Sequence, residues 1–280
     1  MSRNWLITGV SSGLGRAIAE AALADGGYVV GTLRKPEQAA EFESLAPGRA
    51  IALQLDVTDR EKIASTIPDL LERIGTLDVL VNNAGYGING ALEELSDADI
   101  DHCIATNLVG PMTLIRAVLP HMRERRRGDI INVSSISGFV GYPGLTAYTA
   151  AKFGLSGFSE SLAKELAPFG IRVMVVEPGA FRTKFAQGSL VQAKRIIEDY
   201  AKTPAGYSRK HMASYGGTEE GDPDRLAAAL MALLGGDELP ITFVAGPDCV
   251  AAKRKVHTRG LQDLDRWGEL GSSLVFKQDD

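Results

Sequence analysis

The feature that most constrains the fold is the regular recurrence of short apolar runs, separated by stretches of helical character. Seven such runs are present: Trp5–Thr8, Tyr28–Leu33, Ala50–Leu55, Leu77–Val81, Asp129–Val133, Ile171–Val176 and Ile241–Val244. Strands that alternate with helices form right-handed crossovers, and the resulting parallel sheet is covered by helices on both faces. The sequence therefore predicts a doubly wound α/β fold with a seven-stranded parallel sheet.

The alternation fails once, between Phe181 and Asp222, where a polar stretch with scattered aromatic residues follows the sixth run. It resumes at Asp222-Pro223, an N-cap followed by proline at the first helical position, and Gly235-Gly236 should end that helix. Residues 1–280 thus read as a single domain with an insertion over about 181–222. An extension over about 246–280 is expected to form an amphipathic helix or turn packed on the sheet edge.

The insertion lies before the last helix and strand and is interpreted as a lid over the substrate. Four aromatic residues in it could close over a bound molecule: Phe185, Tyr200, Tyr207 and Tyr215. The alternative is a permanently ordered pair of helices, because Leu190–Tyr200 has a helical pattern.

Charge and cysteine content narrow the class of partner. A net charge of -5 disfavours nucleic acid and anionic membranes, and the basic run Arg123–Arg127 fits the end of a helix. Two cysteines, Cys103 and Cys249, make no disulfide framework, and the four histidines show no metal-ligand spacing. No signal peptide or apolar run of about 18 residues is recognised. We expect a cytoplasmic, metal-free protein that acts on a small molecule.

A glycine-rich segment follows the first predicted strand directly: Thr8-Gly9-Val10-Ser11-Ser12-Gly13-Leu14-Gly15, with a helical pattern from Arg16. Glycines at a strand-to-helix turn let the backbone approach a pyrophosphate closely, and amides at the helix N-terminus face it. A dinucleotide is the natural ligand of such a Rossmann-type turn. A glycine-rich loop alone is a weak signal, but its place at the first strand of a βαβ series strengthens it.

The spacing T-G-x-x-x-G-x-G resembles that of the short-chain dehydrogenase/reductase family, and the resemblance extends from residue 4 to about residue 245. Further motifs occur in the expected order: Asp56, Asn82-Asn83-Ala84-Gly85, Asn107, Ser135, Tyr148-Thr149-Ala150-Ala151-Lys152, and Pro178-Gly179 followed by Thr183. The chain is similar to NADP-preferring members of about its own length, such as hydroxysteroid and retinol dehydrogenases and bacterial oxidoreductases.

The cofactor contacts that the resemblance implies run along the whole carboxyl edge of the sheet. They comprise Thr8, Gly9, Ser11, Ser12, Gly13, Leu14, Gly15, Arg34, Asp56, Val57, Asn83, Ala84, Gly85, Tyr148, Lys152, Pro178, Gly179 and Thr183. Asp56 can accept a hydrogen bond from the adenine amino group. Pro178, Gly179 and Thr183 resemble the segment that holds the nicotinamide carboxamide, although Thr183 could instead cap the following turn.

The residues about 20 positions beyond the glycine loop decide between NADP and NAD. An acidic residue there binds the ribose of NAD, but this sequence has Gly31-Thr32-Leu33-Arg34-Lys35. An arginine or lysine can pair with the 2′-phosphate of NADP, and Ser11 or Ser12 can add a hydroxyl. Arg34 could also be a solvated charge at a strand end. We predict NADP, with NAD as the alternative.

Tyr148 and Lys152 are four residues apart in a predicted helix, so their side chains share one face. A nearby ammonium favours the phenolate, and the expectation is therefore that Lys152 lowers the pKa of Tyr148 and makes it a general acid and base. Ser135 follows the fifth strand and can hold the substrate oxygen, with Ser134 as its competitor. The resemblance assigns Asn107 to a water in the proton relay and Lys152 also to the nicotinamide ribose.

Together these residues predict an NADP(H)-dependent oxidoreductase that transfers a hydride between the nicotinamide and a carbonyl or secondary alcohol. A catalytically silent redox-sensing regulator of the same fold is the main alternative. A nucleotide-sugar epimerase is disfavoured by length and by the glycine spacing. Five loop residues suggest an apolar or aromatic substrate: Tyr86, Phe139, Tyr142, Phe185 and Tyr207. Helices near Asp101–Met122 and Tyr148–Leu166 resemble those that pair in family homodimers and homotetramers, so a homo-oligomer is expected.

Overall fold

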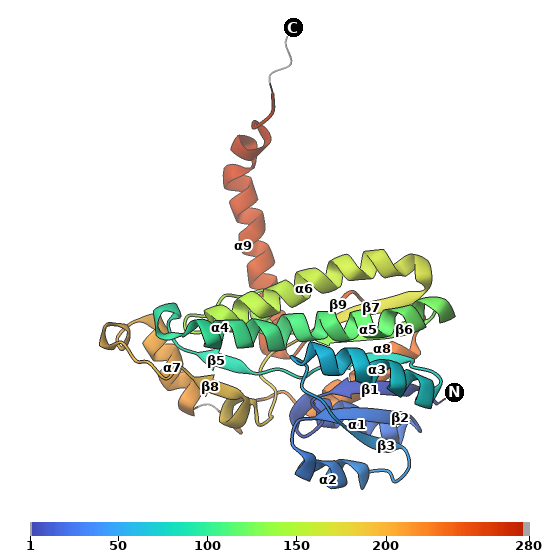
Figure 1. Cartoon of the computed structure of the whole chain (residues 1–280). Coiled ribbons are helices and arrows are strands. Elements are labelled where there is room, and N and C mark those ends of the chain that lie inside the picture. The colour runs from blue at the N-terminus through green and yellow to red at the C-terminus, as the bar shows by residue number, and fades with distance from the viewer. Residues whose placement is uncertain (1, 215, 277–280) are drawn as a thin grey trace.

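The computed structural model describes residues 2–214 and 216–276 and has a seven-stranded parallel sheet at its centre (Figure 1). The strand order is β3-β2-β1-β4-β6-β7-β9. The strands span Asn4–Thr8 (β1), Tyr28–Leu33 (β2), Ala50–Gln54 (β3), Val79–Asn82 (β4), Gly128–Val133 (β6), Ile171–Pro178 (β7) and Thr242–Ala245 (β9). The order reverses between β1 and β4, which is where ligands bind in doubly wound sheets. The predicted fold class is confirmed.

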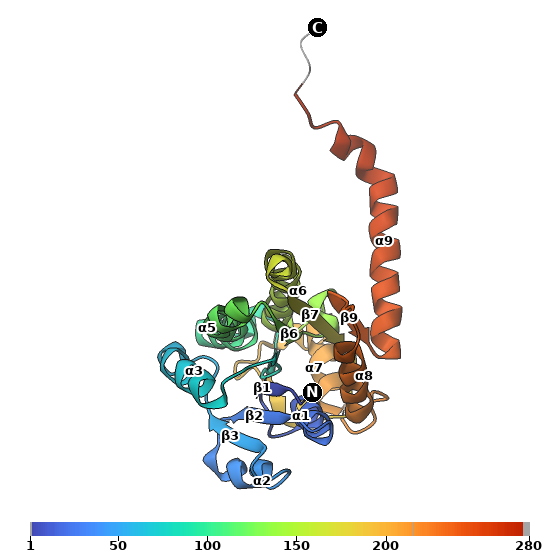
Figure 2. The same cartoon turned by 90° about the vertical axis from the view of Figure 1, so that its right-hand side faces the viewer.

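Helices cover both faces of this sheet (Figure 2). Their bounds are Gly13–Ala24 (α1), Ala39–Glu43 (α2), Arg60–Ile74 (α3), Asp97–Ile104 (α4), Gly110–Arg125 (α5), Thr146–Leu166 (α6), Pro204–Ser214 (α7), Pro223–Gly235 (α8) and Pro247–Ser272 (α9). Alternation along β1 explains the two layers, since Trp5 and Ile7 pack with α1 and α8, while Leu6 packs with α3, α5 and α6.

Helix ends follow the expected local signals. The side chain of Asp222 accepts a hydrogen bond of 2.9 Å from the backbone N–H of Asp224 at the start of α8, and that helix ends at Gly235. The basic run ends α5, with Arg126 in the left-handed conformation at φ 51°. A π-helix over Ala105–Val109 joins α4 to α5, an irregularity that often marks functional sites.

The helical run Asp97–Arg125 is long and apolar enough to cross a membrane by length and composition, contrary to the expectation that no such segment exists. Core helices of soluble proteins pass the same test. Here Leu114, Ile115, Val118 and Met122 lie buried against the sheet in the α3, α5 and α6 layer. The run is therefore explained by its place in the core.

The insertion holds more regular structure than its sequence indicated. Strand β8, Leu190–Gln192, pairs in parallel with β5, Gly87–Asn89, in a separate two-stranded sheet. The helical alternative for Leu190–Tyr200 is therefore wrong. Gly87 lies close to the Leu190 side chain, since an added Cβ would lie 2.7 Å from Cδ1 of Leu190. Tyr215 lies outside the described residues.

The C-terminal segment forms the expected helix, but only its first turns pack on the sheet edge, against β9, and the predicted packing is wrong for the rest of it. Helix α9 leaves the body after its first turns and projects away from it (Figures 1 and 2). Of its residues only Cys249 is buried.

Candidate active site

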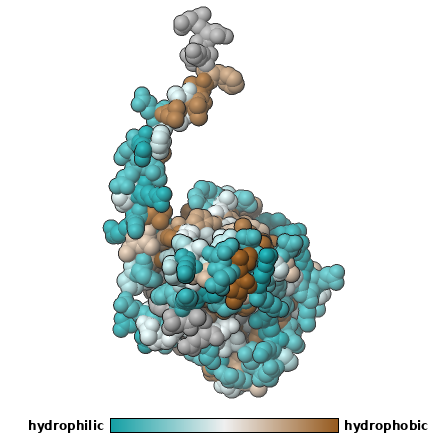
Figure 3. Space-filling view, turned by 90° about the vertical axis from the view of Figure 1, so that its left-hand side faces the viewer, coloured by the Kyte–Doolittle hydropathy of each residue, from teal (hydrophilic) through white to brown (hydrophobic). Residues whose placement is uncertain are grey.

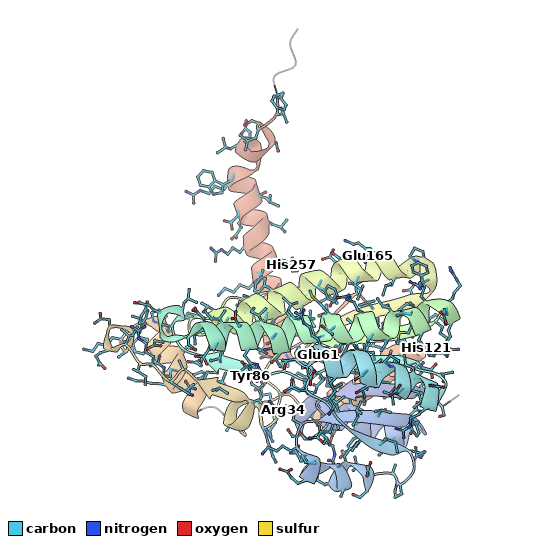
Figure 4. The ribbon with its side chains drawn as sticks, viewed as in Figure 1. Arg34, Glu61, Tyr86, His121, Glu165 and His257 are labelled. Carbon is cyan, nitrogen blue, oxygen red and sulfur yellow. The ribbon has the colours of Figure 1, made fainter. Side chains whose placement is uncertain are left out.

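A cleft of about 520 Å³ opens at the carboxyl ends of the strands and extends from the glycine loop to the insertion. It contains all the predicted cofactor and catalytic residues except two. The exceptions, Thr8 and Gly15, belong to the glycine-rich segment but do not line the cleft. Figure 4 shows Arg34 and Tyr86 at this end of the sheet, whereas His121 lies at the opposite end.

The glycine loop is built for close backbone approach. Gly9 and Gly13 adopt φ 74° and φ 63°, which disfavour other residues. A Cβ at Gly15 would lie 2.3 Å from Nδ2 of Asn83 and 2.4 Å from the carbonyl oxygen of Gly9. The cradle therefore exists only with glycine there, and it leaves the first turn of α1 open to the cleft.

Asn83 and Thr8 tie the glycine loop to the end of β4. The Asn83 side chain donates hydrogen bonds of 2.9 Å and 3.1 Å to the carbonyl oxygens of Thr8 and Gly9. The Thr8 hydroxyl accepts from the backbone N–H groups of Asn83 and Ala84, at 2.9 Å each. Thr8 therefore acts through the loop, whereas Asn83 holds the loop and also lines the cleft.

The adenosine end of the cleft is marked by Asp56 and Arg34. The Asp56 carboxylate accepts hydrogen bonds of 2.8 Å and 2.7 Å from the backbone N–H and hydroxyl of Thr58. Burial acts to raise the pKa of Asp56, but these bonds and the charge of Arg34 outweigh it and lower that pKa. Arg34 and Lys35 are exposed where β2 ends, and both line the cleft.

Helix α6 carries both Tyr148 and Lys152 into the cleft, with both side chains buried. The Lys152 ammonium donates a 2.9 Å hydrogen bond to the carbonyl oxygen of Val133 and lies 5.7 Å from the centre of the Tyr148 ring. The spacing of four residues therefore places the pair as expected.

The expected lowering of the Tyr148 pKa does not occur in this environment. Burial raises the pKa of Tyr148 to about 12, against a hydrogen bond with Ser135 that lowers it. Burial lowers the pKa of Lys152 to about 8. The sequence could not show this effect, because it depends on how completely both side chains are removed from water.

The structure separates the two candidate serines. Ser134 is buried and directed at α6, where its hydroxyl lies 3.1 Å from the carbonyl oxygen of Lys152 and 3.1 Å from the hydroxyl of Ser156. Ser135 hydrogen-bonds to the Tyr148 phenol and accepts a 3.1 Å bond from the backbone N–H of Ser137. Ser135 is thus the serine beside the phenol.

Asn107 lies in the π-helix, beneath the Tyr148–Lys152 pair. Its side-chain nitrogen donates to the carbonyl oxygens of Tyr86, at 2.9 Å, and Cys103, at 3.0 Å. Among the described residues its Oδ1 atom is buried with no hydrogen-bond partner. A Cβ built on Gly85 would lie 2.6 Å from that oxygen and 3.6 Å from the Lys152 ammonium. The acceptor and the ammonium therefore both lie beside Gly85.

Three of the five predicted substrate residues line the cleft, namely Tyr86, Tyr142 and Phe185. The other two do not. The Lys253 ammonium lies 4.1 Å from the centre of the Phe139 ring. Tyr207 is exposed on α7, outside the cleft. The Phe185 ring lies 5.9 Å from that of Tyr148, on the wall of the cleft.

Sequence reasoning missed the base of α9 as part of the site. Asp248 lines the cleft and accepts a 2.8 Å hydrogen bond from the backbone N–H of Ala180. A Cβ on Gly179 would lie 2.1 Å from an oxygen of Asp248, so any other residue there would displace this carboxylate. The one available signal was an acidic residue in the first turn of the helix that follows Gly246-Pro247.

The fold and this cleft define a doubly wound α/β oxidoreductase. The short chain dehydrogenase profile matches residues 3–193. "Oxidoreductase BOA17" of Botryotinia fuckeliana is 38% identical over 271 residues, which cover 96% of this chain and 98% of that protein. The chain belongs to the short-chain dehydrogenase family.

Two solved structures bear on the architecture. A short-chain dehydrogenase from Streptomyces avermitilis superposes with a TM-score of 0.91 at 40% identity, covering 98% of each chain. This coverage includes α9 in the shared fold. A metagenomic short-chain oxidoreductase in complex with NADP superposes with a TM-score of 0.69 at 31% identity, covering 88% of this chain and 97% of that one.

Proposed function

We infer that this protein is an NADP(H)-dependent oxidoreductase acting on a carbonyl or secondary alcohol. The observation that carries the proposal is the buried Tyr148–Lys152 pair, which shares one cleft with Ser135 and with the glycine loop. When bound, the nicotinamide supplies or accepts the hydride.

The cleft fits a dinucleotide on two structural grounds. The cradle at Gly9 and Gly15 would be filled by any Cβ, and Ser12 lies at the start of α1, where backbone N–H groups favour phosphate. Arg34 and Lys35 would pair with a 2′-phosphate, which supports NADP over NAD. The related metagenomic enzyme, solved in complex with NADP, agrees with this choice.

The residues of the chain would handle the proton. With its pKa raised to about 12, Tyr148 holds its proton at neutral pH and is set to donate it to a carbonyl oxygen. Ser135 would hold that oxygen by its hydroxyl. Lys152 and the Oδ1 atom of Asn107, which both lie beside Gly85, would restore the proton of Tyr148 through water.

The substrate is proposed to be apolar or aromatic. Five side chains on the walls near Tyr148 are mainly apolar: Tyr86, Tyr142, Phe185, Leu190 and Met212. Small-molecule sites combine such walls with a few polar groups. The cytoplasmic location and the homo-oligomer stay predictions.

The test is a turnover assay with NADPH and NADH against aromatic ketones, steroids, retinoids, sugars and small diketones. We expect NADPH oxidation with an apolar ketone. Dinucleotide binding without turnover across the whole panel would favour the redox-sensing regulator, and faster turnover with NADH would overturn the NADP assignment.

A further inference from the structure

The projecting part of α9 and the residues that follow it, here called the arm (residues 255–276), carry exposed apolar side chains. Seven are more than half exposed: Leu261, Leu264, Trp267, Leu270, Leu274, Val275 and Phe276. At 100° per residue the four that lie in the helix, Leu261, Leu264, Trp267 and Leu270, fall within one half of its circumference, together with Val256. The other three follow the end of the helix at Ser272. Thr258, Gln262 and Glu269 lie on the opposite half. Figure 3 shows the arm standing clear of the body, with hydrophobic residues near its tip.

The arm is a poor helix by itself. Three glycines, Gly260, Gly268 and Gly271, lie on or beside its apolar face, and no heavy atom beyond the adjacent residues and the backbone of the helix lies within 4 Å of where their Cβ atoms would be. Each glycine costs a helix roughly 1 kcal/mol relative to alanine, and isolated helices are marginal in water. Packing against another surface would offset this cost, and glycines permit a close approach there.

The base of the arm is firmly anchored, so its direction is set by the body. The Lys253 ammonium lies 2.8 Å from the buried Glu177 carboxylate, and the Cys249 thiol donates a 3.1 Å hydrogen bond to the carbonyl oxygen of Glu177. Together with Asp248, these contacts fix the first turns of α9 beside β7. The arm therefore extends away from the body on the side of α6 (Figures 1 and 2).

Charge along the helix indicates what covers the apolar face. The amino-terminal half of α9 carries Lys253, Arg254, Lys255 and Arg259, whereas the next part carries Asp263, Asp265 and Glu269 against one Arg266. Two such helices side by side repel when parallel and attract when antiparallel. Arg254 and Asp265 border the apolar face on the same edge, which is where antiparallel helices bring opposite charges together.

The exposed area also matches this partner. At roughly 100 Å² for each side chain, the four exposed apolar residues of the helix offer on the order of 400 Å², and the three beyond Ser272 add on the order of 300 Å². A stable interface takes about 800 Å² from each partner, and a twofold axis requires one patch to be its own complement. We propose that the arm pairs with the arm of a second copy of this chain, antiparallel about an axis near Gly260, through the face of Leu261, Leu264 and Trp267.

The first experiment measures self-association of the full-length protein by analytical ultracentrifugation. The variant Leu264→Asp/Trp267→Asp should raise the dissociation constant by at least about tenfold, as expected for buried anchor residues. The matched control, Thr258→Asp/Gln262→Asp, places the same charges on the polar face and should change it less than about threefold. Equal behaviour of both variants would overturn the proposal.

The second experiment maps the orientation with single cysteines, because both native cysteines are buried. Val256→Cys, Leu261→Cys, Leu264→Cys, Trp267→Cys and Leu274→Cys are oxidised separately. Antiparallel arms should cross-link with themselves only near the twofold axis and not at both ends, and Thr258→Cys should remain uncross-linked. Cross-linking at every apolar position would indicate parallel arms, and cross-linking at none would remove the second copy as the partner. Either result overturns the proposal.

A charge exchange identifies the partner independently of folding defects. Making the basic half acidic, Arg254→Glu/Lys255→Glu/Arg259→Glu, or the acidic half basic, Asp263→Lys/Asp265→Lys/Glu269→Lys, should weaken self-association in each protein alone. Mixing the two should restore association, because one arm is then acidic and the other basic. Failure of the mixture to associate, with both variants folded, would contradict pairing between arms.

Discussion

Tyr148 is the residue on which the proposed chemistry depends most directly. Tyr148→Phe keeps the buried ring and removes only the proton donor, so turnover should fall by a factor on the order of 10²–10⁴ while NADPH binding stays measurable. The control is Tyr142→Phe, which removes a hydroxyl from the same cleft without touching Lys152. Steady-state rates and a cofactor titration check both variants, and more than about a tenth of the activity left in Tyr148→Phe contradicts the role.

Arg34 tests the cofactor preference. Arg34→Asp replaces attraction to a 2′-phosphate by repulsion, so the dissociation constant for NADPH should rise by about tenfold or more while that for NADH changes little. Arg16→Asp, at an arginine outside the cleft, serves as a comparison. A similar loss for both cofactors would mean that Arg34 has a structural role.

Lys152 should give stability a pH dependence. Its pKa is about 8 in the folded state, below the ordinary value of 10.5. Between these pH values only the unfolded chain holds the proton, so the free energy of unfolding should rise with pH from about 8 to 10.5. The rise is on the order of 2–3 kcal/mol.

Lys152→Met removes this proton from both states. Denaturant titrations of the two proteins without cofactor, at pH 7.5 and pH 10, measure the effect. We expect the free energy of unfolding to increase more between these two pH values in the wild type than in the variant. An equal change in the free energy of unfolding in both proteins would show that folding does not lower the pKa of Lys152.

At the scale of elements, the middle of the insertion, residues 190–209, is attached to the rest of the protein. Buried Glu94 accepts hydrogen bonds from the backbone N–H groups of Ala91, at 2.8 Å, and Ile197, at 2.9 Å, and pairs with Arg209. Pairing of β5 with β8 adds a second attachment. A lid motion would therefore involve the segments on either side of this middle, near Phe185 and after Arg209.

Hydrogen exchange tests this division. Amides over 190–209 should be protected without ligand, whereas those over 182–189 and 210–214 should exchange quickly and slow when NADPH and a substrate analogue bind. Glu94→Ala should speed exchange over 190–209 by about tenfold or more, since it leaves Arg209 unpaired. The neighbouring Glu93→Ala loses only exposed contacts and should not. Uniform protection throughout would leave the insertion as fixed scaffold.

At the scale of the whole molecule, α6 has an exposed apolar residue on the face expected to meet a second body. Phe153 is 44% exposed, on the outer side of the helix that carries Tyr148. If family-like pairing occurs there, Phe153→Asp should lower the sedimenting mass at micromolar concentration, whereas Lys164→Ala should not. Combined with the arm variant it should give monomers, and unchanged mass would exclude α6 from the assembly.

The sequence by itself determined the sheet, the glycine loop and the identity of the residues in the cleft. These features depend on local periodicity, as in β1, and on fixed spacings, as in the Tyr148–Lys152 pair. Both are set by residues that lie close together in the sequence, so they do not depend on how distant parts of the chain pack. The three-residue strands β5 and β8 were missed because segments so short have no periodicity to read.

Only the tertiary structure decided properties that arise from distant parts of the chain. It put Ser134 in the core and Ser135 at the phenol, brought Asp248 to Gly179, and kept most of α9 off the sheet. It also raised the pKa of Tyr148, because burial is set by everything that packs around a side chain rather than by its neighbours in sequence.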